Sequence, residues 1–125
     1  MPATILLVDD DIATRVSLRF ALEDFGYNVI DASEGHQGLQ CYRRSSVDIV
    51  ITDIHMPGMD GLEMIQAIQQ YDPTAIAIAM SASREQLSLA RHVGAQQTLE
   101  KPLDLSELCH VLDTWLETRP QAIMN

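Results

Sequence analysis

Short apolar runs alternate with longer stretches of helical periodicity five times along this chain. The runs lie at residues 5–8, 29–30, 49–51, 75–80 and 98–99. Their apolar residues stand at consecutive positions, which is typical of strands that are covered on both faces in a parallel sheet. This alternation predicts an α/β domain of the (βα)5 type, an open sheet whose strands are joined by right-handed crossovers.

The stretches between the runs are predicted to be helices. They lie at residues 14–25, 34–44, 62–68, 84–93 and from about 106 onward. In the first, Leu18 and Phe25 recur at helical spacing before Gly26, a residue type that commonly follows the end of a helix. In the last, an apolar side that starts at Leu105 and includes Trp115 is expected to face the core, so Trp115 is given no binding role.

Length and composition fit one compact domain. Of the 125 residues, 46% are hydrophobic, which is enough for a core without disulfide bonds or structural metals. We therefore expect a single domain over residues 1–125, with its core at about 4–117 and a frayed tail at 118–125. Cys41 and Cys109 are isolated from one another in the sequence and are expected to be reduced.

The charge of the chain excludes some partners. Eighteen acidic residues against eight basic ones give a net charge of −10, which opposes direct binding to nucleic acid and to anionic lipid. The apolar stretches are far too short to span a bilayer, and no signal-peptide cleavage site follows the first of them. We expect a soluble, cytoplasmic protein without a membrane segment, and its oligomeric state is left open.

Polar and charged residues follow four of the expected strands. Asp9, Asp10 and Asp11 follow the first strand, Asp53 ends the third, and two further positions come after the fourth and fifth, namely Ser81 and Lys101. Lys101 is the only lysine of the chain. Because ligands of open parallel sheets bind at the carboxyl ends of the strands, these side chains are expected to meet at one edge.

A cluster of carboxylates needs a counter-charge. Two carboxylates about 4 Å apart repel by roughly 4 kcal/mol at an effective dielectric near 20, which is comparable to the whole stability of a small domain. Hard oxygen ligands with room for water suit Mg²⁺. With the metal in place, Asp53 is a candidate nucleophile toward phosphorus, and the Lys101 ammonium and Ser81 hydroxyl would stabilise the transferring oxygens.

Each of these residues also has a structural interpretation when taken singly. Asp53 could be a turn residue, Ser81 the cap of the next helix, and Lys101 a solvated charge. Asp11 is interpreted as a first-turn carboxylate favoured by the helix dipole. Their joint placement is what favours the chemical interpretation.

Four segments together resemble the receiver domain of bacterial two-component response regulators. They are residues 5–11, residues 51–61 around Asp53, residues 80–82 and residues 100–102. The resemblance extends over about residues 4–116 and implies a doubly wound, flavodoxin-like sheet with strand order 2-1-3-4-5. It implies that Asp53 accepts a phosphoryl group from the phosphohistidine of a sensor histidine kinase or phosphotransfer protein, and that a downstream effector protein or domain responds.

The resemblance also assigns a metal site and a signalling role. Mg²⁺ would bind Asp10 and Asp53 directly, Asp9 through water, and the backbone carbonyl of His55. Lys101 would pair with the phosphoryl oxygens, and the bond from Lys101 to Pro102 is often cis in this family. The domain would take part in its own phosphorylation and dephosphorylation without being an enzyme.

One position departs from the family pattern. Receiver domains commonly carry tyrosine or phenylalanine three residues before the lysine, where ring rotation reports phosphorylation, and this chain has Thr98. The mechanism of output is therefore open. His55 and Ser83, two residues beyond Asp53 and Ser81, occupy positions that tune the lifetime of the aspartyl phosphate in the family.

Three other functions are alternatives to this interpretation. An aspartate-nucleophile phosphatase typically has a second carboxylate two residues after the nucleophile, where this chain has His55. A flavodoxin-like cofactor binder needs Gly, Ser and Thr donors after the first strand, and three aspartates there repel a phosphate. A receiver-fold interaction domain that is not phosphorylated would not need the complete acidic, serine and lysine set. Whether an effector domain follows Asn125 stays undecided.

Overall fold

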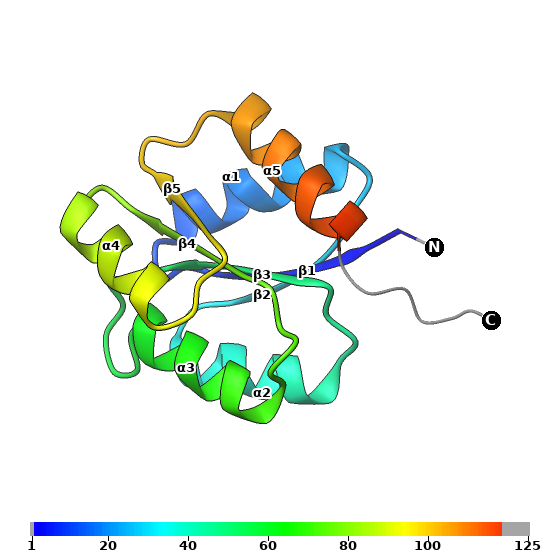
Figure 1. The fold of residues 1–125 in the computed structure, drawn as a ribbon. Coiled ribbons are helices and arrows are strands. Elements are labelled where there is room, and N and C mark those ends of the chain that lie inside the picture. Colours follow the sequence, from blue (N-terminus) through cyan, green and yellow to red (C-terminus); the bar gives the residue numbers. More distant parts are fainter. Residues whose placement is uncertain (1, 119–125) are drawn as a thin grey trace.

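The computed structural model describes residues 2–118 and contains five strands that alternate with five helices (Figure 1). The strands are β1 (Thr4–Val8), β2 (Asn28–Ala32), β3 (Ile49–Asp53), β4 (Ala77–Ser81) and β5 (Gln97–Glu100). The helices are α1 (Ile12–Asp24), α2 (Gly35–Arg44), α3 (Gly61–Tyr71), α4 (Arg84–His92) and α5 (Leu105–Thr118). Of the tail expected at 118–125, Thr118 belongs to α5 and the rest lies outside the described residues.

The strands form one parallel sheet in the order β2-β1-β3-β4-β5. This order and the doubly wound (βα)5 architecture are confirmed. The chain moves from β1 outward to β2, and then returns past β1 to β3. Strand order therefore reverses between β1 and β3, and this is the point at which open α/β sheets bind their ligands.

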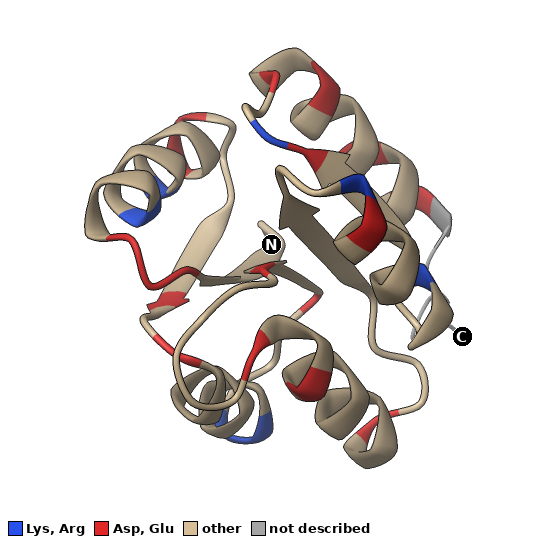
Figure 2. Ribbon diagram, turned by 90° about the vertical axis from the view of Figure 1, so that its left-hand side faces the viewer, with Lys and Arg blue, Asp and Glu red and all other residues tan. Residues whose placement is uncertain are grey.

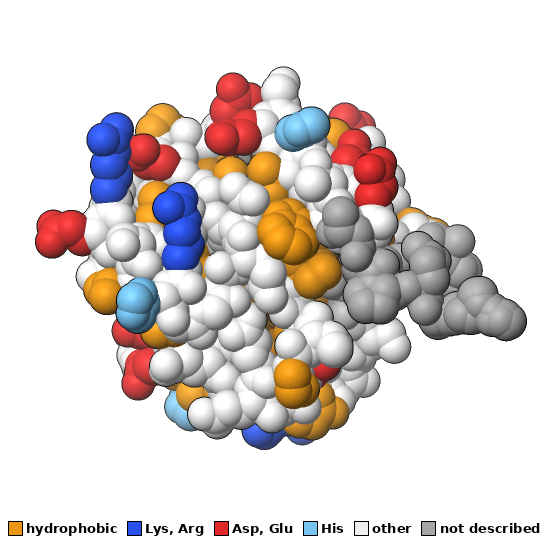
Figure 3. All heavy atoms as spheres, in the orientation of Figure 1, with side chains coloured by type: hydrophobic (Ala, Val, Ile, Leu, Met, Phe, Trp, Pro, Cys, Tyr) orange, Lys and Arg blue, Asp and Glu red, His pale blue; other side chains and the backbone are white. Residues whose placement is uncertain are grey.

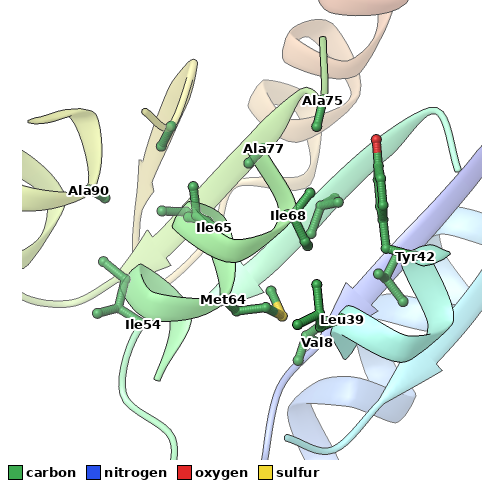
Figure 4. Packing of buried hydrophobic residues seen from close by; sticks show 14 of the residues in the cluster. Val8, Leu39, Tyr42, Ile54, Met64, Ile65, Ile68, Ala75, Ala77 and Ala90 are labelled. Atoms are coloured by element: carbon green, nitrogen blue, oxygen red, sulfur yellow. The ribbon is translucent and has the colours of Figure 1, made fainter. Parts of the chain in front are cut away.

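Helices cover both faces of the sheet. Helices α1 and α5 lie on one face, and α2 and α3 lie on the other (Figure 1). The second face is packed by side chains such as Val8, Leu39, Met64 and Ile68 (Figure 4). The first face is packed by a separate cluster that includes Leu22 of α1 and Leu112 of α5. Two apolar layers explain why the strands are apolar at consecutive positions.

Several boundaries differ from the expected ones for local reasons. Helix α1 begins two residues early because the Asp11 side chain accepts a hydrogen bond from the backbone N–H of Thr14 and caps the helix. Strand β4 begins at Ala77, later than residue 75, and the carbonyl of Ala75 accepts a hydrogen bond from the Gln96 side-chain amide instead of from a strand. Leu105, expected in the core, is 45% exposed and starts α5.

Within residues 2–118, no helix has both the length and the apolar character needed to cross a bilayer. On the face seen in Figure 3, apolar side chains of the described residues form small separate patches, and charged side chains lie mainly around the rim. Cys41 and Cys109 are both free and half-buried, as expected.

Candidate functional site

The predicted site residues meet at the carboxyl edge of the sheet. Figure 2 looks onto this edge, where acidic segments lie in several of the loops around the strand ends. Carboxylate oxygens of Asp9, Asp10 and Asp53 all lie within 4.8 Å of one another. Asp53 is the last residue of β3 and is 9% exposed, so the interpretation of Asp53 as a turn residue is wrong.

Lys101 lies against these carboxylates. Its Nζ is 3.2 Å from Oδ1 of Asp53 and 3.6 Å from Oδ2 of Asp9. The side chain is only 27% exposed, so Lys101 is not the solvated charge that was considered for it. One ammonium group faces three carboxylates, and the cluster keeps a formal excess of negative charge.

Asp9 is the most deeply buried member of the cluster. Its side chain is fully buried, and Oδ1 accepts a hydrogen bond of 2.9 Å from the backbone N–H of Asp11. Oδ2 has no hydrogen-bond partner among the described residues. Burial raises the pKa of the Asp9 carboxyl above its usual range, and the charges of Asp53 and Asp10 raise it further, although Lys101 and the Asp11 N–H act in the opposite direction.

This donor set fits a hard divalent cation. A buried carboxylate oxygen without a hydrogen-bond partner, in a cluster with excess negative charge, is the environment that a cation would stabilise. Carboxylate oxygens are the ligands that Mg²⁺ prefers. His55 follows Asp53 by two residues and its side chain is exposed. Its backbone carbonyl as a fourth ligand stays a prediction.

Ser81 ends β4 beside the cluster. It is 3% exposed, and its carbonyl accepts a hydrogen bond of 2.9 Å from the N–H of Lys101. The interpretation of Ser81 as a helix cap is wrong, because Ser83 caps α4 by accepting from the N–H of Gln86. Ser81 Oγ instead accepts a hydrogen bond of 3.0 Å from the N–H of Ser83. The Ser81 hydroxyl is therefore hydrogen-bonded to the N-cap residue of α4.

The Asp11 side chain is not part of the cluster of Asp9, Asp10 and Asp53. Its carboxylate caps α1, one residue ahead of the first turn in which it was expected. Hydrogen bonds from the hydroxyl and the backbone N–H of Thr14 hold the pKa of Asp11 below its usual range. The bond from Lys101 to Pro102 is cis, as the family resemblance implies.

Gly61 has a role that the sequence did not reveal. It starts α3, and its N–H donates a hydrogen bond of 2.8 Å to the carbonyl of Ile54. A Cβ at this position would lie 2.3 Å from the carbonyl oxygen of Asp53. The absence of a side chain thus lets α3 approach the backbone of Asp53 closely. The sequence signal for this role is a glycine next to the helix-capping Asp60, and the same pattern is equally typical of a turn.

Thr98, at the position that departs from the family pattern, makes a contact with Arg91 that the sequence did not predict. Thr98 is 7% exposed, and its hydroxyl accepts hydrogen bonds of 3.0 Å and 2.6 Å from Nε and Nη2 of Arg91 in α4. Both residues line an open hollow of about 460 Å³ between α4 and β5. Since only Leu87 and Ala90 of α4 are buried, this polar contact is a substantial part of what fixes the helix.

Replacing Thr98 with valine should lower the free energy of unfolding by about 1–2 kcal/mol, because the change removes a buried acceptor and leaves the Arg91 guanidinium without it. Urea unfolding would measure the loss. Thr114 is the matched control, because its hydroxyl donates to the carbonyl of His110 at an exposed site on α5. Thr114→Val should change stability by less than about 0.5 kcal/mol. Equal losses in the two variants would contradict a special role for the Arg91 contact.

A comparison with protein families decides what kind of domain carries this site. The family model for the response regulator receiver domain matches residues 5–113. The chain belongs to this family. The family predicted from four short segments is thereby confirmed, and Asp9, Asp10, Asp53 and Lys101 all lie within the matched residues.

Curated relatives of this receiver domain are longer proteins. The transcriptional regulatory protein GlrR of Escherichia coli is 36% identical over 118 residues, which are 93% of this chain and 27% of GlrR. The autoinducer 1 sensor kinase/phosphatase LuxN of Vibrio harveyi is 30% identical over 115 residues, which are 90% of this chain and 13% of LuxN. The receiver domain therefore spans about a quarter or less of the length of these two relatives.

Solved structures include receiver domains of the same fold. The response regulator TrrA of Thermotoga maritima, in complex with Mg²⁺ and BeF, is 30% identical with a TM-score of 0.85. The match covers 90% of this chain and 98% of TrrA.

Proposed function

We propose that this receiver domain accepts a phosphoryl group on Asp53 in a Mg²⁺-dependent reaction and thereby switches a protein-interaction surface. The observation that carries the proposal is the contact of the single lysine, Lys101, with Asp53 inside a cluster of three carboxylates. A cluster of this kind is unfavourable for stability alone, so a function in phosphoryl chemistry accounts for it better.

In the proposed reaction, a carboxylate oxygen of Asp53 attacks the phosphorus of a phosphohistidine on the donor protein. A P–O bond forms, the P–N bond breaks, and the imidazole nitrogen keeps the electron pair of the broken bond. Lys101 would neutralise charge on the transferring oxygens, and the Ser81 hydroxyl would donate a hydrogen bond to one of them. A bound Mg²⁺ would supply Lewis-acid stabilisation of the same oxygens.

Asp10 and Asp53 would hold Mg²⁺ directly and Asp9 would hold it through water, with the backbone carbonyl of His55 as the remaining protein ligand. The raised pKa of Asp9 has a consequence for this binding, because protonation of this carboxyl removes a negative charge that favours the metal. Metal affinity should therefore fall as the pH is lowered toward the pKa of Asp9. The complex of TrrA with Mg²⁺ and BeF supports this assignment by analogy.

The proposed partners are proteins. A sensor histidine kinase or a phosphotransfer protein would donate the phosphoryl group, and a downstream effector protein or domain would respond to it in the cytoplasm. LuxN, a sensor kinase/phosphatase, and GlrR, a transcriptional regulatory protein, contain segments similar to this chain and support a place in signal transduction. The domain would act as a signalling switch, and it would not turn over a substrate as an enzyme does.

Labelling with a small acyl phosphate tests the proposal. With Mg²⁺ present, the wild-type protein should take up one phosphoryl group, and Asp53→Asn should take up none above background. Asp24→Asn is the matched control, because Asp24 is an exposed residue at the end of α1 and its loss should leave labelling unchanged. Labelling should fall strongly when Mg²⁺ is withheld. Label that survives in Asp53→Asn would refute the proposal.

A further inference from the structure

Arg15 of α1 reaches back to the loop that carries Asp9 and Asp10. Its Nη1 donates a hydrogen bond of 2.7 Å to the backbone carbonyl of Asp9, and its side chain is only 16% exposed. The backbone N–H of the same residue donates a hydrogen bond of 2.9 Å to the carbonyl of Asp11. Arg15 thus binds both ends of the three-residue acidic loop.

The acidic loop needs such support because it lies outside the regular strand. Strand β1 ends at Val8, and the Asp9 N–H still bonds to the carbonyl of Ala32 in β2 at 3.2 Å. The Asp9 carbonyl accepts its hydrogen bond from Arg15. Without the Arg15 guanidinium, the backbone carbonyl of the buried Asp9 would lose its hydrogen-bond donor. An unpaired carbonyl in a protein interior lowers the free energy of unfolding.

Asp31 of β2 forms an ion pair with the Arg15 guanidinium. Its Oδ2 lies 4.0 Å from Nε of Arg15 and 3.2 Å from Nη1 of Arg19. Arg15 therefore connects the acidic loop to a neighbouring strand at the point where repulsion among the carboxylates would push the loop away. Arg19 shares the Asp31 contact, and its other ion pair among the described residues is with Glu23.

We propose that Arg15 is a positioning residue that holds Asp9 and Asp10 in place for the divalent cation. The inference rests on the proposed function, since it assigns a role in the same metal site. Residues that orient metal ligands without touching the metal change affinity by about 10- to 100-fold when they are replaced. Arg15 acts through the Asp9 backbone and is not itself a ligand.

The sign of the expected effect separates this role from simple electrostatics. Arg15 is positively charged, so by charge alone its removal would make the site more negative and strengthen the binding of a cation. Loss of positioning predicts the opposite, namely weaker binding. Arg19→Gln removes the same charge from the same helix without a contact to Asp9, and it therefore measures the effect of charge alone.

The experiment compares Mg²⁺ dissociation constants by calorimetry for the wild type, Arg15→Gln, Arg15→Lys and Arg19→Gln. Arg15→Gln should bind Mg²⁺ about 10-fold more weakly, and Arg15→Lys, which keeps the charge and one donor, should fall between it and the wild type. Arg19→Gln should bind within about twofold of the wild type or more tightly. Mg²⁺ affinity in Arg15→Gln equal to or above that of Arg19→Gln would overturn the proposal.

A second measurement needs no metal and separates this inference from the proposed function. Amide hydrogen exchange at Asp9 and Asp11, measured without added metal, reports on the loop itself, because both N–H groups are hydrogen-bonded in the structure. Exchange at these two amides should quicken in Arg15→Gln and stay unchanged in Arg19→Gln. Unchanged exchange in Arg15→Gln would overturn the positioning role. A wild type that fails to bind Mg²⁺ would instead refute the proposed function.

Discussion

Gly61→Ala should lower the free energy of unfolding by about 3 kcal/mol and should also slow phosphorylation, although Gly61 carries no functional group. The added Cβ would lie 2.3 Å from the Asp53 carbonyl oxygen and 2.9 Å from Cα of Ile54. Both atoms belong to the backbone, so no side chain can move aside to relieve the overlap. Either α3 or the end of β3 must shift, and a shift of β3 displaces Asp53.

Gly38→Ala is the matched control for this effect. A Cβ there would lie 2.7 Å from Sδ of Met64 and 2.9 Å from Cγ2 of Val8. The Met64 side chain is flexible and can move, and alanine is favoured over glycine within a helix by about 1 kcal/mol. We expect a loss below about 1 kcal/mol in urea unfolding, with labelling unchanged. Similar losses in the two variants would contradict the backbone overlap at Gly61.

Lys101→Met should expose the repulsion within the carboxylate cluster. The change removes the ammonium group that pairs with Asp9 and Asp53 while keeping much of the apolar volume of the side chain. Since Lys101 is partly exposed, the expected loss is about 2 kcal/mol, between the values for surface and fully buried pairs. Urea unfolding without metal would measure it. Added Mg²⁺ should stabilise Lys101→Met more than the wild type, because the metal then supplies the missing positive charge.

Lys101→Arg is the control for charge in that experiment. It keeps a positive charge, so it should retain most of the stability that Lys101→Met loses. A planar guanidinium does not replace a compact ammonium in its contacts, however. We expect Asp53 still to be phosphorylated in Lys101→Arg, while the response of a partner protein is impaired. A stability of Lys101→Met equal to that of the wild type, with and without Mg²⁺, would contradict the account of the cluster.

Much of the fold follows from local patterns. Consecutive apolar residues predicted strands covered on both faces, and the sheet has an apolar layer on each side. The placement of charged residues after the strands then predicted that Asp9, Asp53 and Lys101 would meet, and the structure brings them together. The strand order could not be predicted from local patterns, because no such pattern indicates which strands are neighbours. It was predicted from the family resemblance.

The features that were not predicted are contacts between residues that are close in the sequence but lie on different elements or loops. Arg91 bonds to Thr98 across the gap between α4 and β5, and Arg15 bonds to Asp9 from the second turn of α1. Each arginine alone reads as a solvated helix residue. The close approach of Gly61 to Asp53 depends on how α3 is set against β3. These contacts depend on side-chain conformation and on the position of each helix against the sheet, and hydrophobic periodicity predicts neither.

Asp53, and no other carboxylate of the cluster, is the proposed site of phosphorylation. Borohydride reduces an aspartyl phosphate to homoserine, so reduction after labelling, followed by peptide mass spectrometry, identifies the modified residue. We predict homoserine at position 53 alone, with Mg²⁺ required for its formation. Homoserine at position 9 or 10, or a labelled protein that contains no homoserine, would contradict the account.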